Sequence, residues 1–297
     1  MLSILIPTYN YNALPLVEAV LKQIKSEDII FEIICRDDGS STTMNFENEK
    51  INQLQNCSFK INQNNLGRTL NRQLLATEAK YDWLLFLDSD VIPKSDTFLS
   101  TYLKETNNNY DAIFGGFAYI KNNTDNSKSL RYTFGKHREE VAAEIRNKTP
   151  YKVIISANFL IKKDTFINLN AVDTGNSYGL DYLFGSLLKN KNIKIKHIDN
   201  EVYHLGIDTN TDYLNKTKKA VATLVNLSTD KKINKHDISL LKAFNKLKAT
   251  KTVYMFRNIF SFLKPIIEKQ ILGKQPNLFL FDIYRLGYFC ELMKTKI

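Results

Sequence analysis

The stretch Trp83-Leu84-Leu85-Phe86-Leu87-Asp88-Ser89-Asp90 decides how the rest of this sequence is interpreted. Its first five residues are the longest uninterrupted apolar run of the chain, which predicts a buried strand. Two carboxylates spaced i and i+2 directly after such a strand suit a hard divalent cation. A capping turn before a helix predicted over residues 95–106 also explains Asp and Ser at these positions. The residues that follow the other predicted strands decide between these two interpretations.

Strands and helices alternate on both sides of this stretch. Such alternation predicts an α/β fold, with a mostly parallel sheet covered by helices on both faces. The predicted strands are 2–6, 29–35, 60–61, 83–87, 111–114, 153–155, 159–161 and 193–198. The predicted helices of this part are 14–25, 68–79, 95–106, 138–148 and 181–189.

Three predicted strands end in residues that suit ligand binding. They are followed by Pro7-Thr8-Tyr9-Asn10, Asp37-Asp38-Gly39-Ser40 and Asp88-Ser89-Asp90. The carboxyl ends of parallel strands meet at one edge of a sheet, where ligands bind. Carboxylates gathered at one edge repel one another unless a cation neutralises them. The three endings together therefore favour a metal site over a set of unrelated turns.

The later part of the chain changes character. Residues 121–150 are polar and rich in Asn, Lys and Arg, which indicates a surface insertion. From about residue 210 the pattern is helical over 212–227, 236–249, 253–263 and 278–293, with breaks predicted at Pro265, Gly273 and Pro276. We therefore expect a domain over 1–206, with halves 1–115 and 116–206, and a helical C-terminal region over 207–297.

Charge is distributed unevenly along the 297 residues. The net charge is +10, but residues 1–188 have a balance of −2 and residues 189–297 a balance of +12. The basic part predicts an anionic partner or a solvated basic surface. No run approaches the ~20 apolar residues of a membrane span. No signal peptide is recognisable, and three cysteines without metal-type spacing favour a reduced, cytoplasmic protein.

Taken in order, these motifs resemble family 2 glycosyltransferases, inverting enzymes with a GT-A fold. The resemblance covers about residues 1–205 and includes a bacterial subgroup that assembles surface polysaccharides. Each motif alone is weakly specific, but five motifs in the same order and spacing, together with the single residue Asp181, are specific. The matching segments are 3–10, 32–34 with 37–40, 65–68 with Asn71, 85–93, Asp181 and 202–204.

The resemblance implies a role for each matching residue. It implies that Pro7, Tyr9 and Asp38 hold the nucleotide base and ribose, with help from Arg68. It implies that Asp88 contacts ribose or metal, that Asp90 binds Mn²⁺ or Mg²⁺, and that His204 completes the metal or diphosphate site. Asp181 would be the general base that deprotonates the acceptor hydroxyl. The implied partners are a nucleotide diphosphate sugar, with UDP-sugars favoured, and a saccharide or lipid-linked acceptor.

The same residues also fit purely structural roles. Arg68 fits an exposed arginine at a helix start as well as a diphosphate ligand, and His204 fits a core or surface histidine. Asp181 also fits a helix N-cap. Where the family usually has Glu-Asp, this chain has Leu180-Asp181, so a contact to the acceptor is absent and a catalytically impaired nucleotide-sugar-binding paralogue remains an alternative.

Two other classes of function are less consistent with the sequence. A nucleotidyltransferase needs a glycine-rich basic loop after its first strand, and Pro7-Thr8-Tyr9-Asn10 has no glycine. A nucleic-acid-binding module explains the basic C-terminal part but leaves the acidic strand ends without a purpose, so we expect no nucleic acid partner. Residues 253–294 mix apolar and basic side chains, which fits peripheral contact with the inner face of the membrane, packing on the catalytic domain or a homodimer interface.

Overall fold

A computed structural model describes the chain except residues 26, 121–124, 171–177, 234–236 and 295–297. Two compact units are present. Unit 1 comprises Met1–Ile120, Glu139–Asn176 and Lys191–Gly206, and unit 2 comprises Lys121–Arg138, Ser177–Asn190 and Ile207–Ile297. Each unit is therefore assembled from segments that are distant in sequence.

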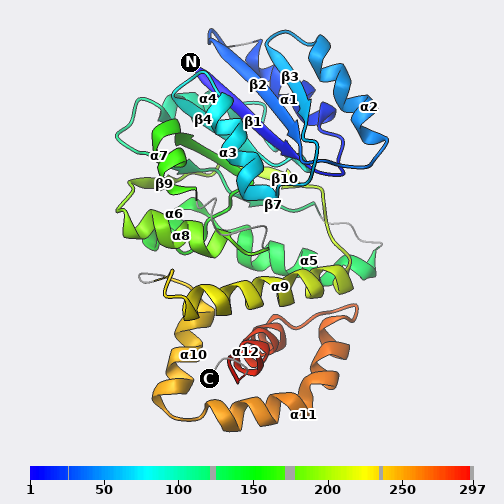
Figure 1. Cartoon of the computed structure of the whole chain (residues 1–297), viewed down its shortest axis with the longest axis vertical. Helices are drawn as coiled ribbons and strands as arrows, with labels where there is room; N and C mark the ends of the chain where they lie inside the picture. Colours follow the sequence, from blue (N-terminus) through cyan, green and yellow to red (C-terminus); the bar gives the residue numbers. More distant parts are fainter. Residues whose placement is uncertain (26, 121–124, 171–177, 234–236, 295–297) are drawn as a thin grey trace. The chain divides into compact units, whose positions relative to one another are not determined.

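A seven-stranded sheet with the order β3-β2-β1-β4-β8-β6-β9 forms the centre of unit 1 (Figure 1). All its strands are parallel except β8, which runs antiparallel to both neighbours, β4 and β6. The predicted α/β fold with a mostly parallel sheet is thereby confirmed. Its strands are β1 (Leu2–Thr8), β2 (Phe31–Asp37), β3 (Cys57–Ile61), β4 (Trp83–Leu87), β6 (Ala112–Phe114), β8 (Asn158–Lys162) and β9 (Ile195–His197).

A second sheet of three short strands, in the order β5-β10-β7, was not predicted from the sequence. It contains β5 (Val91–Pro93), β7 (Phe117–Ala118) and β10 (Val202–His204). The strand β5 begins one residue after Asp90, so this small sheet brings the C-terminal part of unit 1 next to the Asp88-Ser89-Asp90 segment.

Helices cover the large sheet. The helix α3 packs on β1 and β2, α7 packs on α3 and β8, and α6 packs on β9. Buried aromatic rings form part of the core, in which Phe86 is stacked on Phe159 and lies close to Phe166. The helices of unit 1 are α1 (Leu14–Ile24), α2 (Met44–Glu49), η1 (Lys50–Gln53), α3 (Arg68–Glu78), α4 (Phe98–Glu105), α6 (Ala143–Lys148) and α7 (Lys163–Leu169).

Unit 2 is helical. Its long helices surround α12, which packs against α9, α10 and α11 (Figure 1). Among the described residues, no helix combines the length and the apolar character needed to cross a bilayer. Its helices are η2 (Asn126–Lys128), α5 (Ser129–Phe134), α8 (Asp181–Asn190), α9 (Asn210–Thr229), α10 (Ser239–Ala249), α11 (Val253–Ile271) and α12 (Leu278–Lys294), and η3 (Gly135–Glu139) spans the boundary with unit 1.

Three local predictions are wrong. Residues 153–155 form no strand, because the strand after them, β8, already has β4 and β6 on its two sides. The charged run 138–148 is not one helix on a surface insertion, since Arg146 in α6 is buried. Pro265 does not end α11, although an interior proline costs about 3 kcal/mol. Burial of Phe260, Ile267 and Ile271 on the inner face of α11 outweighs that cost.

The contact between α11 and α12 depends on Gly287. A Cβ atom at this position would lie 2.1 Å from Cγ of the Phe260 ring, so only glycine allows the two helices to approach this closely. We predict that Gly287→Ala lowers the free energy of unfolding of unit 2 by about 1–3 kcal/mol, despite the higher helix propensity of alanine. Urea unfolding measures the change. Ser261→Ala on the exposed side of α11 serves as control, and equal stability of the two variants would contradict this packing.

Candidate functional site

The three acidic and polar strand endings meet at one edge of the large sheet, as predicted. The strands β2, β1 and β4 are neighbours and parallel, so their carboxyl ends lie on the same side. The strand β1 extends through Pro7 to Thr8, which pairs with Asp37 at the end of β2. Tyr9 follows with a half-exposed ring, and the Asn10 backbone N–H donates to Ser40 Oγ over 2.7 Å. Tyr9 is therefore available for stacking beside the Asp37-Asp38-Gly39-Ser40 turn.

Asp38 organises the loop that leads into α3. Its Oδ1 accepts from the Leu66 backbone N–H over 2.9 Å and its Oδ2 from that of Gly67 over 2.8 Å. Gly39 has a φ of +72°, and a Cβ there would lie 2.6 Å from the Asn64 backbone carbon. The buried carboxylate thus fixes the backbone just before Arg68, a structural role that the sequence did not predict. The nucleotide contact expected of Asp38 stays a prediction.

Asp88 joins two arginines of α3. Its Oδ2 lies 2.7 Å from Arg68 Nη2, and its Oδ1 lies 2.5 Å from Arg72 Nη2. Arg72 Nη2 also donates to the Ser156 carbonyl over 2.5 Å, while Arg68 Nη2 donates to Ser156 Oγ over 3.1 Å. Asp88 therefore positions Arg68 at the helix start, where positive charge and backbone N–H groups favour a phosphate.

Sequence reasoning missed Arg72. Its guanidinium is buried, and it lies 5.8 Å from the centroid of the Phe86 ring and 5.9 Å from that of Phe159. Its spacing of four residues from Arg68 was the available signal, since residues i and i+4 share a helix face.

Asp90 meets His204, although the two residues are far apart in sequence. His204 Nε2 lies 3.2 Å from Asp90 Oδ2, because β10 pairs with β5 so that His204 stands opposite Val91. The Leu205 backbone N–H donates to the Asp90 carbonyl over 2.9 Å. A Cβ at Gly206 would lie 2.2 Å from Asp90 Oδ2, so only glycine leaves room for the carboxylate here.

The electrostatics of this pair keep Asp90 ionised. Burial raises the pKa of the Asp90 carboxyl, but the hydrogen bond and charge of His204 and the charge of Arg68 outweigh burial, so its pKa is lowered overall. The pKa of the neighbouring Tyr11 is raised by burial and by the negative charge of Asp90. On the other side of the imidazole, His204 Nδ1 is buried and has no hydrogen-bond partner among the described residues.

The Asp90 and His204 pair fits a divalent cation. A carboxylate oxygen and an imidazole nitrogen are both metal ligands, and two adjacent ligands of an octahedral ion with bonds of about 2.1 Å lie about 3 Å apart. The observed separation of 3.2 Å is close to this spacing, and a cation held by both atoms would replace the proton through which His204 Nε2 bonds to the carboxylate. In the part of the chain that the structure describes, no group of three or more His, Cys, Asp and Glu side chains has a metal-binding arrangement, and both Asp88 oxygens face arginines. A metal at this pair would therefore take its remaining ligands from a bound substrate and water.

Asp181 is the first residue of α8 in unit 2. Gly179, with a φ of +96°, precedes it, and a Cβ there would lie 2.9 Å from the Ala220 Cα in α9. The next residue, Tyr182, accepts a hydrogen bond from Arg285 Nη2 over 3.1 Å at its hydroxyl. The start of α8 is therefore fixed against α9 and α12 of the same unit. Asp181 is exposed there, and its expected role as the general base stays a prediction.

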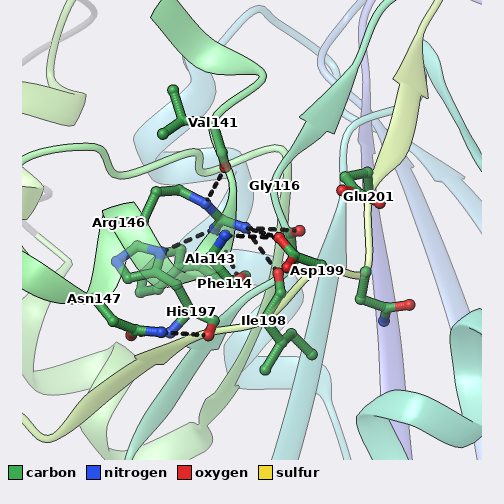
Figure 2. Close-up of polar contacts among 12 residues, drawn as sticks. Phe114, Gly116, Val141, Ala143, Arg146, Asn147, His197, Ile198, Asp199 and Glu201 are labelled. Carbon is green, nitrogen blue, oxygen red and sulfur yellow. Dashed lines mark hydrogen bonds and ion pairs between the residues drawn. The ribbon is translucent and has the colours of Figure 1, made fainter.

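A buried polar cluster around Arg146 holds the segment that leads into β10 (Figure 2). Arg146 Nη1 donates to the Phe114 carbonyl over 3.1 Å and to His197 Nδ1 over 2.9 Å, and Nη2 donates to the Ile198 carbonyl over 2.7 Å. His197 Nε2 donates to the Pro150 carbonyl over 2.7 Å. The imidazole is therefore neutral, and burial together with the Arg146 charge lowers its pKa to about 4. This cluster supports His204 through the chain that connects β9 to β10.

The comparisons with known proteins agree with this architecture. The model of glycosyl transferase family 2 matches residues 3–169, more than half of the chain, so the chain belongs to glycosyltransferase family 2. This confirms the expected family and favours glycosyl transfer over nucleotidyl transfer. The buried strand β4, the acidic turn after it and Arg68 all lie within the matched part.

The relatives that are similar in sequence match only part of this chain. The chain is 29% identical to an uncharacterized glycosyltransferase of Mycoplasma genitalium over 57% of each chain. It is 32% identical to an uncharacterized glycosyltransferase of Haemophilus influenzae over 40% of this chain and 43% of that protein. The chain thus spans about half the length of the curated relatives it matches. A mannosyltransferase from Pyrobaculum calidifontis, solved with GDP-Man and Mn²⁺, has a similar fold, with a TM-score of 0.54 and 13% identity, over 99% of this chain and 74% of that one.

The buried imidazole predicts a specific sensitivity to acid. Because the pKa of His197 in the folded protein lies below its value of ~6.5 in the unfolded chain, the unfolded state binds more protons between about pH 6.5 and pH 4. The free energy of unfolding should therefore fall as the pH drops through this range, by up to about 3 kcal/mol. His197→Gln retains a donor and an acceptor but cannot titrate, so it should lose this part of the pH dependence in urea unfolding at about pH 7 and about pH 5. The same pH dependence in both proteins would show that His197 does not cause it.

Proposed function

We propose that the chain transfers a sugar from a nucleotide diphosphate sugar to an acceptor hydroxyl, with inversion at the anomeric carbon and with a divalent cation. The single observation that carries the proposal is the contact between Asp90 Oδ2 and His204 Nε2, formed at the edge where β1, β2 and β4 end. Family membership supports glycosyl transfer, and the pairing of carboxylate and imidazole supports Mn²⁺ more than Mg²⁺, because Mg²⁺ prefers oxygen ligands only.

In this proposal unit 1 binds the donor. The Tyr9 ring stacks on the base beside Pro7, Asp38 holds the loop before α3, and Arg68 reaches the diphosphate at the helix N-terminus. Asp90 and His204 would hold Mn²⁺, which would supply a positive charge opposite the negative charge of the departing diphosphate. Asp88 acts by orienting Arg68, and it contacts the ribose or the metal if the arginine moves on binding.

In this proposal Asp181 is the general base. Asp181 accepts the proton of the acceptor hydroxyl while the oxygen of that hydroxyl forms a bond to the anomeric carbon. The bond from that carbon to the phosphate oxygen breaks at the same time, and the nucleotide diphosphate leaves with the electron pair. Attack from the face opposite the leaving group inverts the configuration. General-base assistance of this kind contributes about 10²–10⁴-fold to the rate.

The donor and acceptor are proposed as classes. UDP-sugars are the favoured donors, and GDP-mannose is the nearest competitor because the mannosyltransferase with this fold was solved with GDP-Man and Mn²⁺. The acceptor is a saccharide or a lipid-linked saccharide, as expected for polysaccharide assembly. Release of nucleotide from UDP-glucose, UDP-galactose, UDP-N-acetylglucosamine and GDP-mannose, each with Mn²⁺ and with chelator, identifies the donor.

Asp90→Asn tests the metal site. The amide keeps the shape of the side chain but loses the charge that attracts the cation, so Mn²⁺-dependent release of nucleotide should fall by at least about a hundredfold. Asp96→Asn is the matched control, because Asp96 is exposed a few residues further along the same connection. Equal activity of the Asp90→Asn variant and the control would contradict the proposed metal site.

Asp181→Asn tests the base. We expect transfer to fall by about 10²–10⁴-fold, while calorimetry shows unchanged donor binding, because Asp181 is proposed to act on the acceptor alone. Asp164→Asn is the matched control, since Asp164 also lies in the first turn of a helix, α7. Transfer at the wild-type rate would mean that another residue is the base. Donor binding by the wild-type chain without any transfer would instead favour a non-catalytic paralogue in which Leu180 has replaced the usual glutamate.

A further inference from the structure

The outer face of α11 is an exposed apolar row. It consists of Met255, Ile259, Phe262 and Ile266, which are 57%, 51%, 81% and 64% exposed, respectively. Their spacing of four, three and four residues places them on one side of the helix. The opposite side carries Phe260, Ile267 and Ile271, which are buried in the core of unit 2. The helix is therefore apolar on two sides, and only one of them has a partner within the described residues.

Such a row differs from ordinary surface composition. Single exposed apolar side chains are common on soluble proteins, whereas a contiguous group of them marks a surface that binds another protein or a membrane. A helix that packs on one side only is expected to be polar on its other side. Phe262 in particular exposes four fifths of its surface in the middle of the row, where a polar residue would serve the fold equally well.

The chain around this row is strongly basic. Residues 246–274 contain seven Lys and Arg residues but only one acidic residue, Glu268. Glu268 is already paired with Lys218 and accepts a hydrogen bond from Tyr284. Among the residues that the structure describes, six of the seven basic side chains form no ion pair. They are Lys246, Lys248, Lys251, Arg257, Lys269 and Lys274.

We propose that the outer face of α11 binds the surface of an anionic lipid bilayer, with the helix parallel to the membrane plane. The apolar row would enter the boundary between headgroups and acyl chains, and the basic residues before, within and after the helix would contact lipid phosphates. Lys269, which is exposed and follows Ile266 by three residues and Phe262 by seven, lies on the same side of the helix as the row. Of the segment 253–294, only α11 has this character, because α12 packs against three other helices.

A second copy of the chain is a less suitable occupant. A symmetric dimer through this row would bring two segments with a net charge of +6 together, and like charges oppose such an interface. A lipid surface with negative charge is attracted by the same residues, each basic side chain near it contributing about fivefold to the partition. The proposal concerns where the chain works and does not depend on the reaction proposed for it.

Flotation with vesicles tests the proposal. The full chain is mixed with vesicles of phosphatidylcholine alone, or with vesicles in which about a third of the lipid is phosphatidylglycerol. We expect flotation with the anionic vesicles only, and release at high salt. The variant Phe262→Ser/Ile266→Ser should partition at least about tenfold more weakly. Both side chains are exposed, so the variant should keep the unfolding midpoint of the wild type.

The control is Phe46→Ser, which removes a similarly exposed ring, 72% accessible, from α2 of unit 1 and should float like the wild type. Wild-type protein that stays in the soluble fraction with both vesicle types would overturn the proposal. So would flotation of the double variant at the wild-type level. A wild-type dimer in sedimentation equilibrium that the double substitution dissociates would assign the row to a subunit interface instead, and would also overturn it.

Discussion

The contact between Asp90 and His204 links the segment after β4 to β10, and the small sheet of unit 1 forms around it. A partly buried carboxylate that stays ionised needs a positive or hydrogen-bonding partner, and here that partner comes from a strand more than a hundred residues later in the chain. The small sheet β5-β10-β7 brings the two residues together, and Gly206 leaves the space that the carboxylate needs. The Arg146 and His197 cluster in turn fixes the segment before β10 (Figure 2).

Two kinds of charge compensation occur side by side at this edge of the sheet. Asp88 pairs with Arg68 and Arg72, whereas Asp90 accepts a hydrogen bond from an imidazole nitrogen, which becomes available as a metal ligand once its proton is lost. The Asp-x-Asp motif is therefore not a symmetric pair of metal ligands. Its first aspartate positions the cationic residues proposed for phosphate binding, and its second is the proposed metal ligand. This division of roles follows from which chain segment each aspartate faces.

Much of this arrangement could be predicted from the sequence because its signals are local. The apolar run Trp83–Leu87 predicted β4 with its observed bounds, and the βα alternation predicted that β1, β2 and β4 run parallel. Residues 153–155 and Pro265 were interpreted wrongly because their outcome depends on tertiary contacts, namely the occupied neighbours of β8 and the buried inner face of α11. The direct Asp90–His204 contact could not be derived from local patterns, since it depends on which distant segments pack together, although the family resemblance had implied that both residues belong to the metal or diphosphate site. The spacing of Arg72 from Arg68 was a local signal, but its pairing with Asp88 also depends on how distant segments pack.

Asp90 and His204 are proposed to bind a divalent cation together with a nucleotide diphosphate. Electron paramagnetic resonance of Mn²⁺ measures this directly, because the signal of the free ion decreases as the ion becomes bound. We expect wild-type protein with UDP or GDP to lower the free Mn²⁺ signal far more than the nucleotide alone, and His204→Gln to abolish most of the difference. An equal signal with wild-type protein and with nucleotide alone would show that the two residues form no such site.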